Sequence, residues 1–172
     1  MMDSLLRELR NAALSQMVMP GHRFFKPTEA FYEALSEYKH LNFVDAGTGS
    51  GQLPEEAMER GFRMVGIDLV ERPGQSNNVV FMEAESFEYS KATWLLMCRP
   101  DHSGWVYDTL EAALKRGAGA FYVSKLSNLI RDLEDYASRA SRVWKDVGED
   151  GEAMFLFLPE DLITDENRYD FD

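Results

Sequence analysis

The sequence is short of several residue types, and each shortage excludes a class of protein. Its one cysteine, Cys98, cannot form an intrachain disulfide, which fits a reducing compartment, so we expect a cytoplasmic protein. Lysine and arginine number 18 against 30 aspartates and glutamates, a net charge of −12. This charge disfavours nucleic acid as a direct partner, because phosphate binding needs a clustered basic surface. A local basic patch stays open, since part of the acid is concentrated in residues 159–172. Histidines occur only at positions 22, 40 and 102, and this scatter matches no metal-ligand spacing.

Long apolar runs are also missing. No run approaches the length needed to span a membrane, and residues 1–19 mix charged and apolar side chains instead of forming the continuous apolar core of a signal peptide. We therefore expect no membrane association. The 172 residues, 45% hydrophobic and 28% charged, are typical of one soluble globular domain.

The most informative stretch is residues 43–51, FVDAGTGSG. An apolar strand leads into Asp45, and then Gly47, Gly49 and Gly51 alternate with small residues before a helix begins. Glycines permit positive φ and let a ligand approach the backbone, while the amides at a helix N-terminus face it. A strand, a glycine turn and a helix in this order predict a site for a nucleotide-like ligand. An ordinary strand-to-helix turn with extra glycines is the alternative.

The spacing of the glycines narrows the choice of ligand. A dinucleotide fingerprint starting at Gly47 needs glycine at position 52, where the chain has Gln52, and this disfavours a nicotinamide oxidoreductase. The Gly-Lys-Ser/Thr triplet of a P-loop does not occur. Asp68 ends the next predicted strand, 17 residues after Gly51, close to the spacing of about 20 at which an acid meets ribose hydroxyls. A strand-end acid without a ligand is the alternative.

The remaining pattern, D-x-G-x-G-x-G after an apolar strand, resembles motif I of the class I S-adenosylmethionine-dependent methyltransferases. The resemblance implies an α/β fold: a three-layer, Rossmann-like sheet with strand order 3-2-1-4-5, to which we add one terminal strand and an N-terminal helical segment. The strands are predicted at 41–45, 62–68, 79–82, 93–98, 120–124 and 153–158. A long helix is predicted from the cap residue Ser127 through Trp144, and residues 83–92 are too few for a long crossover helix.

The same resemblance divides the chain. Residues 1–26 are expected to form an N-terminal helix and a segment that covers the cofactor, residues 27–158 the cofactor-binding domain, and residues 159–172 a solvated acidic tail. Arg23 or Lys26 would meet the methionine carboxylate of S-adenosylmethionine; a solvated basic loop is the alternative. Glu83 and Ala84 resemble the acid-alanine pair that binds adenine. The cofactor-binding residues predicted in full are Asp45, Gly47, Thr48, Gly49, Gly51, Asp68, Leu69, Glu83, Ala84, Arg23 and Lys26.

The loop after the fourth predicted strand, residues 99–105, is expected to hold the catalytic groups. His102 is a candidate general base near neutral pH, Asp101 a candidate for positioning the nucleophile, and Arg99 a candidate partner for an anionic substrate. Capping of the next helix by Asp101 or Ser103 is the structural alternative. The loop lacks the Asn/Asp-Pro-Pro-aromatic run and the Pro-Cys pair of nucleic acid base methyltransferases, so methylation of bases is not supported.

These features predict an enzyme that moves a methyl group from S-adenosylmethionine to a small molecule or a protein side chain. The cofactor would supply the reactivity, and the protein would align the acceptor. Selectivity would come from the N-terminal segment, from the 99–105 loop or from the second subunit of a homodimer. The alternative is a cofactor-binding scaffold or regulatory module without transfer activity, since a fold does not fix a function.

Overall fold

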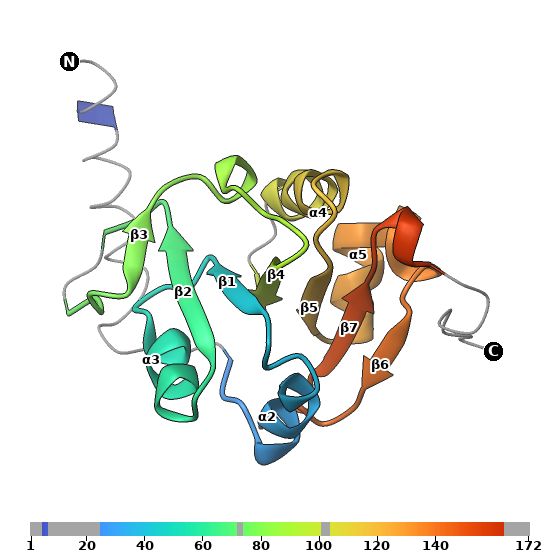
Figure 1. Ribbon diagram of the computed structural model, residues 1–172, viewed down its shortest axis with the longest axis horizontal. Coiled ribbons are helices and arrows are strands. Elements are labelled where there is room, and N and C mark those ends of the chain that lie inside the picture. The colour runs from blue at the N-terminus through green and yellow to red at the C-terminus, as the bar shows by residue number, and fades with distance from the viewer. Residues whose placement is uncertain (1–4, 7–24, 72–73, 101–103, 164–172) are drawn as a thin grey trace.

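A seven-stranded sheet in the order β3-β2-β1-β4-β5-β7-β6 forms the centre of the protein (Figure 1). The computed structural model describes residues 5–6, 25–71, 74–100 and 104–163. The strands are β1 Asn42–Ala46, β2 Arg63–Asp68, β3 Val79–Phe81, β4 Thr93–Cys98, β5 Ala120–Ser124, β6 Arg142–Trp144 and β7 Ala153–Phe157. Strands β1 to β5 are parallel, whereas β7 is antiparallel to both of its neighbours. The predicted order 3-2-1-4-5 is confirmed.

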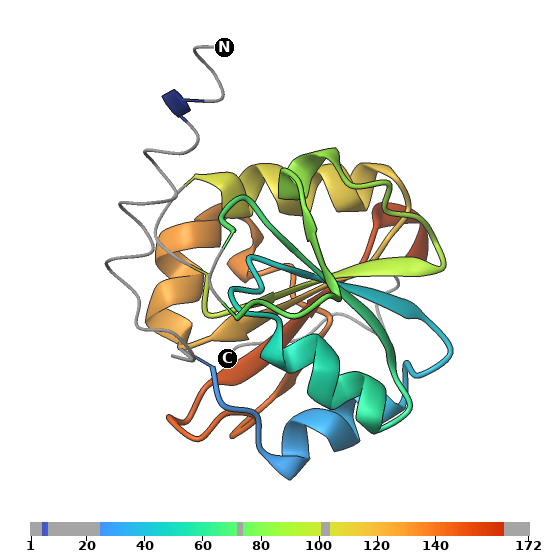
Figure 2. The ribbon, with the colours of Figure 1, turned by 90° about the vertical axis from the view of Figure 1, so that its left-hand side faces the viewer.

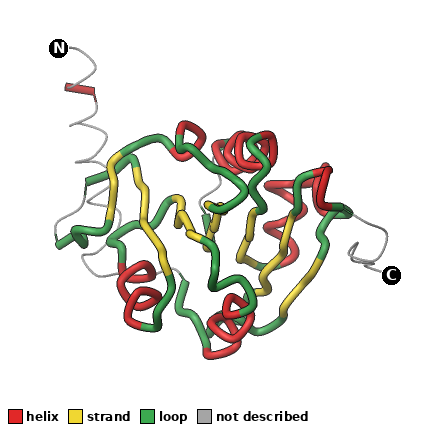
Figure 3. Tube along the Cα trace, viewed as in Figure 1, coloured by secondary structure: helices red, strands yellow, loops and turns green. Residues whose placement is uncertain are grey.

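Helices cover both faces of this sheet (Figure 2). Helices α2 (Glu29–Ser36) and α3 (Gln52–Glu59) lie on one face; α4 (Trp105–Lys115), α5 (Leu126–Ala137) and the short η1 (Ala84–Ser86) lie on the other. A second 3₁₀ turn, η2 (Glu160–Leu162), follows β7. The one-turn η1 confirms that the segment between β3 and β4 holds no long helix, as the tube in Figure 3 also shows. Among the described residues, no helix is long and apolar enough to cross a membrane.

The far edge of the sheet differs from the prediction. The long helix expected through Trp144 ends at Ala137, and Arg142–Trp144 form β6, which pairs with β7. The single expected terminal strand is therefore one half of a hairpin. Val143 and Trp144 continue the helical spacing in the sequence, but the indole of Trp144 packs against Tyr38 and Phe121, with ring centroids 6.2 and 6.1 Å apart. Tertiary packing overrides the local pattern here.

One predicted helix cap is wrong, and so is the structural alternative given for the cap of another helix. Lys125, not Ser127, is the N-cap of α5, and Ser127 lies inside the helix. Gly104 precedes the first residue of α4, so neither Asp101 nor Ser103 occupies the N-cap position. Helix α5 starts directly after β5, and α4 starts after the loop that follows β4. A capping residue alone does not determine the first residue of a helix to better than about one or two positions.

Aromatic packing links the sheet to α2 and to the terminal hairpin. Tyr38, just after α2, contacts Trp94 of β4 and Phe121 of β5, with ring centroids 5.8 and 5.2 Å apart. Trp94 in turn covers Gly119: a Cβ atom added to this glycine would lie 2.6 Å from Trp94 Cε3, closer than van der Waals contact allows. The absence of a side chain at 119 lets the indole lie flat on the backbone that leads into β5.

This contact gives a stability prediction. Gly119→Ala should lower the free energy of unfolding by about 1–3 kcal/mol, because the added methyl group must displace the Trp94 ring from a packed core. Urea unfolding followed by circular dichroism measures the change. Gly104→Ala is the matched control, since none of the described residues has an atom within 4 Å of its Cβ position and its φ of −66° suits alanine. Equal effects of the two substitutions would contradict the prediction.

Candidate functional site

The glycine loop that joins β1 to α3 has the backbone its sequence predicts. Gly47, Gly49 and Gly51 adopt φ values of 72°, 68° and 83°, all in the left-handed region that favours glycine. Three such residues in alternation turn the chain sharply from the end of β1 into α3. The loop therefore lies at the carboxyl edge of the parallel strands, where open α/β sheets bind their ligands.

The three glycines have different surroundings. At Gly47 a Cβ would lie 3.2 Å from the indole of Trp105, which begins α4, and at Gly51 it would lie 2.6 Å from Val79. At Gly49 no atom of the described residues lies within 4 Å of that position. Gly47 and Gly51 are thus packed against neighbouring side chains, and Gly49 is the position where a ligand can approach the backbone.

Asp68, at the end of β2, lies directly beside this open glycine. Its Oδ2 accepts a hydrogen bond of 2.8 Å from the Gly49 amide, and its Oδ1 accepts one of 3.0 Å from the Val70 amide. Each carboxylate oxygen has a second lone pair, so the group can still accept hydrogen bonds from a vicinal diol. The acid predicted from its spacing thus meets the glycine loop.

Hydrogen bonds within the protein hold the loop in shape. The amides of Gly47 and Thr48 both donate to the Ile67 carbonyl of β2, and the Gln75 side chain donates to the Gly49 carbonyl at 2.9 Å. The first amides of the loop are therefore used by the protein itself. A ligand would meet the Cα of Gly49 and the Asp68 carboxylate more readily than these N–H groups.

Thr48 carries an unsatisfied group at this site. Its hydroxyl oxygen is buried and has no hydrogen-bond partner among the described residues. The Thr48 side chain lies over Gly66 of β2, where an added Cβ would be 2.6 Å from Thr48 Cγ2. Buried hydroxyls in proteins normally have a partner, so this one fits a site that a polar ligand completes. Asp45, 3% exposed, is buried on β1 below the loop. The role of Gly66 was missed, because a strand glycine alone carries no functional signal.

The predicted adenine-binding pair lies at the start of η1. The Glu83 side chain is exposed, and Ala84 is half-buried. The Ala84 carbonyl accepts a 2.7 Å hydrogen bond from the hydroxyl of buried Tyr89. Burial raises the pKa of Tyr89 above its usual value, so this hydroxyl remains a donor at neutral pH. Leu69, half-buried, lies between Asp68 and Val70, beside the same loop.

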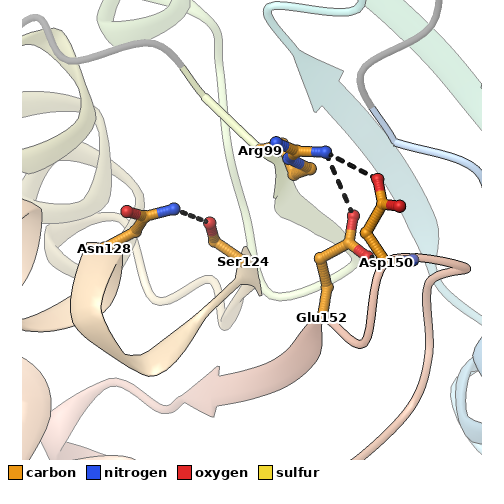
Figure 4. Close-up of polar contacts among 5 residues, drawn as sticks. All are labelled: Arg99, Ser124, Asn128, Asp150 and Glu152. Carbon is orange, nitrogen blue, oxygen red and sulfur yellow. Dashed lines mark hydrogen bonds and ion pairs between the residues drawn. The ribbon is translucent and has the colours of Figure 1, made fainter.

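A second polar cluster lies at the same edge of the sheet, farther along (Figure 4). Arg99 follows β4, and its Nη1 lies 3.1 Å from Asp150 Oδ2 and 3.8 Å from Glu152 Oε2, both on the loop between β6 and β7. At the end of β5, the Ser124 hydroxyl accepts a 2.7 Å hydrogen bond from Asn128 Nδ2. We call Arg99, Asp150 and Glu152 the hairpin cluster.

Sequence reasoning identified only Arg99 of this cluster. Asp150 and Glu152 lie in an acidic, glycine-containing loop that looked like a simple connection, and no motif marks them. Their place beside Arg99 follows only from the fold, because the antiparallel β7 starts at the carboxyl ends of β4 and β5. Arg99 also has a φ of 46°, an uncommon backbone conformation for a residue with a side chain.

The remaining predicted residues do not join either cluster in the described part of the chain. Asp101, His102 and Arg23 lie outside the described residues. Lys26 lines a cleft of about 470 Å³ with residues that include Tyr32, Glu56 and Arg60. This cleft follows α3 toward its C-terminal end, away from the glycine loop at its N-terminal end. No group of three or more metal-binding side chains occurs in the ranges that the structure describes.

Comparison with known proteins supports the fold alone. No family description and no curated protein matches the sequence. A protein of Thermoplasma acidophilum has a TM-score of 0.56 at 12% identity over 76% of this chain and 86% of its own. Magnesium protoporphyrin IX methyltransferase from Synechocystis, solved with bound S-adenosylmethionine, has a TM-score of 0.51 at 10% identity over 74% and 75%.

A TehB-like S-adenosylmethionine-dependent methyltransferase from Corynebacterium glutamicum aligns over 92% of this chain and 97% of its own, with a TM-score of 0.50 at 12% identity. These likenesses agree with the observed strand order and the antiparallel β7. The chain therefore has the Rossmann-like fold of the class I S-adenosylmethionine-dependent methyltransferases.

Proposed function

We propose that this protein binds S-adenosylmethionine and transfers its methyl group to a small molecule or a protein side chain. The observation that carries the proposal is the contact between Asp68 and Gly49: the acid at the end of β2 lies 2.8 Å from the amide of the open glycine. In a sheet of this order, that carboxylate would accept hydrogen bonds from the two hydroxyls of a ribose. The cofactor would then lie across the carboxyl ends of β1 and β2.

The residues around the loop fit this group. Gly49 leaves room for it, and the buried Thr48 hydroxyl lacks a partner among the described residues. Asp68 would hold the ribose, and Glu83 and Ala84 would hold the adenine. Arg23, from the segment before α2, would hold the methionine carboxylate, whereas Lys26 lines the cleft toward the C-terminal end of α3, away from the glycine loop. We extend the proposal to the chain as a whole: residues 1–26 cover the cofactor, 27–158 bind it, and 159–172 form an acidic tail.

The chemistry divides between cofactor and protein. When bound, S-adenosylmethionine supplies a methyl group made electrophilic by its sulfonium. The protein would align the acceptor with that methyl group and take up the proton that the acceptor loses. The loop after β4 is the place for this task, with Asp101 orienting the acceptor, His102 taking the proton, and Arg99 beside the place that the acceptor occupies. The parallel pairing of β1 and β4 puts the end of β4, where this loop begins, at the same edge as the glycine loop.

A non-catalytic cofactor-binding module is the second candidate. Two observations favour it: the Trp105 indole lies on Gly47, and the Asp68 carboxylate already accepts two internal hydrogen bonds. A site whose carboxylate is already hydrogen-bonded on both oxygens can bind a cofactor as a structural ligand. Tight binding of S-adenosylhomocysteine without turnover on any acceptor, and without an effect of His102→Ala, would select this second function.

The role of Asp68 gives the direct test. Asp68→Asn should weaken S-adenosylhomocysteine binding by about tenfold or more, because the amide loses the charge and one acceptor that a ribose diol uses. Isothermal titration calorimetry measures this affinity, and circular dichroism confirms the fold. Asp161→Asn, at an exposed acid in η2, is the matched control. Binding of NAD in place of both adenosyl compounds, or equal affinity of the Asp68→Asn variant and the unaltered protein, would refute the proposed function.

The position of Trp105 gives a second prediction. Because its indole lies on Gly47, a cofactor arriving at the neighbouring Gly49 should change the polarity around this ring. We expect S-adenosylhomocysteine to shift the tryptophan emission of the protein, and Trp105→Phe should abolish that shift. Trp144→Phe should retain it, because Trp144 packs against Tyr38 and Phe121 at the far edge. An unchanged response in Trp105→Phe would contradict the placement of the cofactor.

A further inference from the structure

The hairpin cluster holds a buried acid whose hydrogen bonding is incomplete. The Glu152 side chain is 0% exposed, and its Oε1 accepts a 3.0 Å hydrogen bond from the Asp150 amide. Its Oε2 is buried and accepts no hydrogen bond from any residue in the described ranges. The Arg99 Nη1 atom is 3.8 Å from Oε2, too far for a hydrogen bond.

Such an oxygen is costly for a folded protein. A buried carboxylate normally receives several hydrogen bonds. A carboxylate oxygen that is left without a hydrogen bond costs the free energy of removing it from water. Native proteins show few buried polar atoms without partners, and each one calls for an explanation, such as a functional role or a bound water or ion. The unsatisfied Oε2 therefore indicates a donor from outside the described chain.

Arg99 covers this acid only loosely. Its side chain is 30% exposed, and its 3.1 Å hydrogen bond goes to Asp150, whose side chain is 64% exposed. Exposed ion pairs of this kind contribute little to stability. The Arg99 backbone, in contrast, is fixed, because its amide donates to the Val123 carbonyl at 2.7 Å. Because its Nη1 makes no hydrogen bond to Oε2, the guanidinium can move away from Glu152 while the backbone of β4 stays in place.

The charges of the cluster determine which ligand it favours. One guanidinium faces two carboxylates, so the cluster carries a net charge of −1 within a chain of net charge −12. An anionic group at Arg99 would have to displace Asp150 and would then face Glu152 across a few ångströms. The expectation that Arg99 pairs with an anionic substrate is therefore disfavoured, and a cationic donor fits better.

We propose that Glu152 binds a positively charged nitrogen of the methyl acceptor, a protonated amine, and that the Arg99 guanidinium occupies this place until the acceptor arrives. Glu152 is then a specificity-determining residue that anchors the acceptor, and the acceptor class is an organic amine. The nitrogen held by Glu152 has no lone pair while it is protonated, so the methyl group goes to another nucleophilic atom of the acceptor. The identity of this ligand as the methyl acceptor rests on the proposed function. The cation site itself depends only on the hairpin cluster.

Solution NMR on the full 172-residue chain tests the site with two matched probes. Benzylamine, protonated at pH 7, and benzoate share a ring and differ in the sign of their charge. The Asp150 amide, which donates to Glu152, and Arg99 Nε report on the cluster directly. We expect saturable shifts of both signals with benzylamine and none with benzoate. Shifts with benzoate alone, or with neither probe, would overturn the inference.

Two variants should change the benzylamine affinity in opposite directions. Glu152→Gln removes the charge that attracts the amine and should weaken binding by about tenfold. Arg99→Gln removes the competing cation and should strengthen it. If the cluster were an anion site, Arg99→Gln would abolish benzoate binding instead. Asp150→Asn, an exposed substitution, keeps the inference testable if Glu152→Gln fails to fold, and it should weaken amine binding to a smaller extent.

Separate measurements distinguish the failure of this inference from the failure of the proposed function. Calorimetry with S-adenosylhomocysteine reports on the glycine loop, whereas the amine titration reports on the hairpin cluster. A protein that binds S-adenosylhomocysteine but not benzylamine retains the proposed function and refutes the cation site. A protein that binds benzylamine but no adenosyl compound refutes the proposed function and retains the cation site.

Discussion

The hydrogen bond from the Gly49 amide to the Asp68 carboxylate is the contact on which the candidate cofactor site depends. It joins the loop after β1 to the end of β2, and the adjacent amides of Gly47 and Thr48 join the same strand through the Ile67 carbonyl. Three left-handed glycines turn the loop toward these acceptors. The loop is therefore shaped before any ligand arrives, so a cofactor need not supply the conformational free energy of ordering it.

The carboxylates of the two polar clusters at this edge of the sheet differ in how completely they are hydrogen-bonded. Asp68 has a hydrogen bond on each oxygen, and its remaining lone pairs suit a neutral diol. Glu152 has one oxygen without a hydrogen bond from the described residues, under a guanidinium that does not reach it. The edge itself brings the clusters together, because parallel strands end on one side and the antiparallel β7 starts there. A cofactor at the first cluster and an acceptor at the second would thus share one border of the sheet.

How well each part of the structure could be predicted depended on how far apart in the sequence its interacting residues lie. The glycine loop and Asp68 were predicted because a short motif encodes the backbone turn, and β4 and β5 were bounded correctly because continuous apolar runs mark buried parallel strands. Strand β6 was missed because Val143 and Trp144 fit a helical spacing and only the distant rings of Tyr38 and Phe121 decide otherwise. Glu152 was missed because its partner, Arg99, is far away in the sequence and no local pattern couples them.

The antiparallel hairpin has a consequence for synthesis on the ribosome. Strand β5 receives its outer partner only from β7, so one row of its backbone hydrogen-bonding groups stays unpaired until residues 142–157 have emerged from the exit tunnel. Unpaired strand edges attract other nascent chains. The three-residue β6 then closes the sheet with a short outer edge, which offers a poor template for such pairing. The hairpin that carries Glu152 thus also ends the interval in which the nascent sheet is open to aggregation.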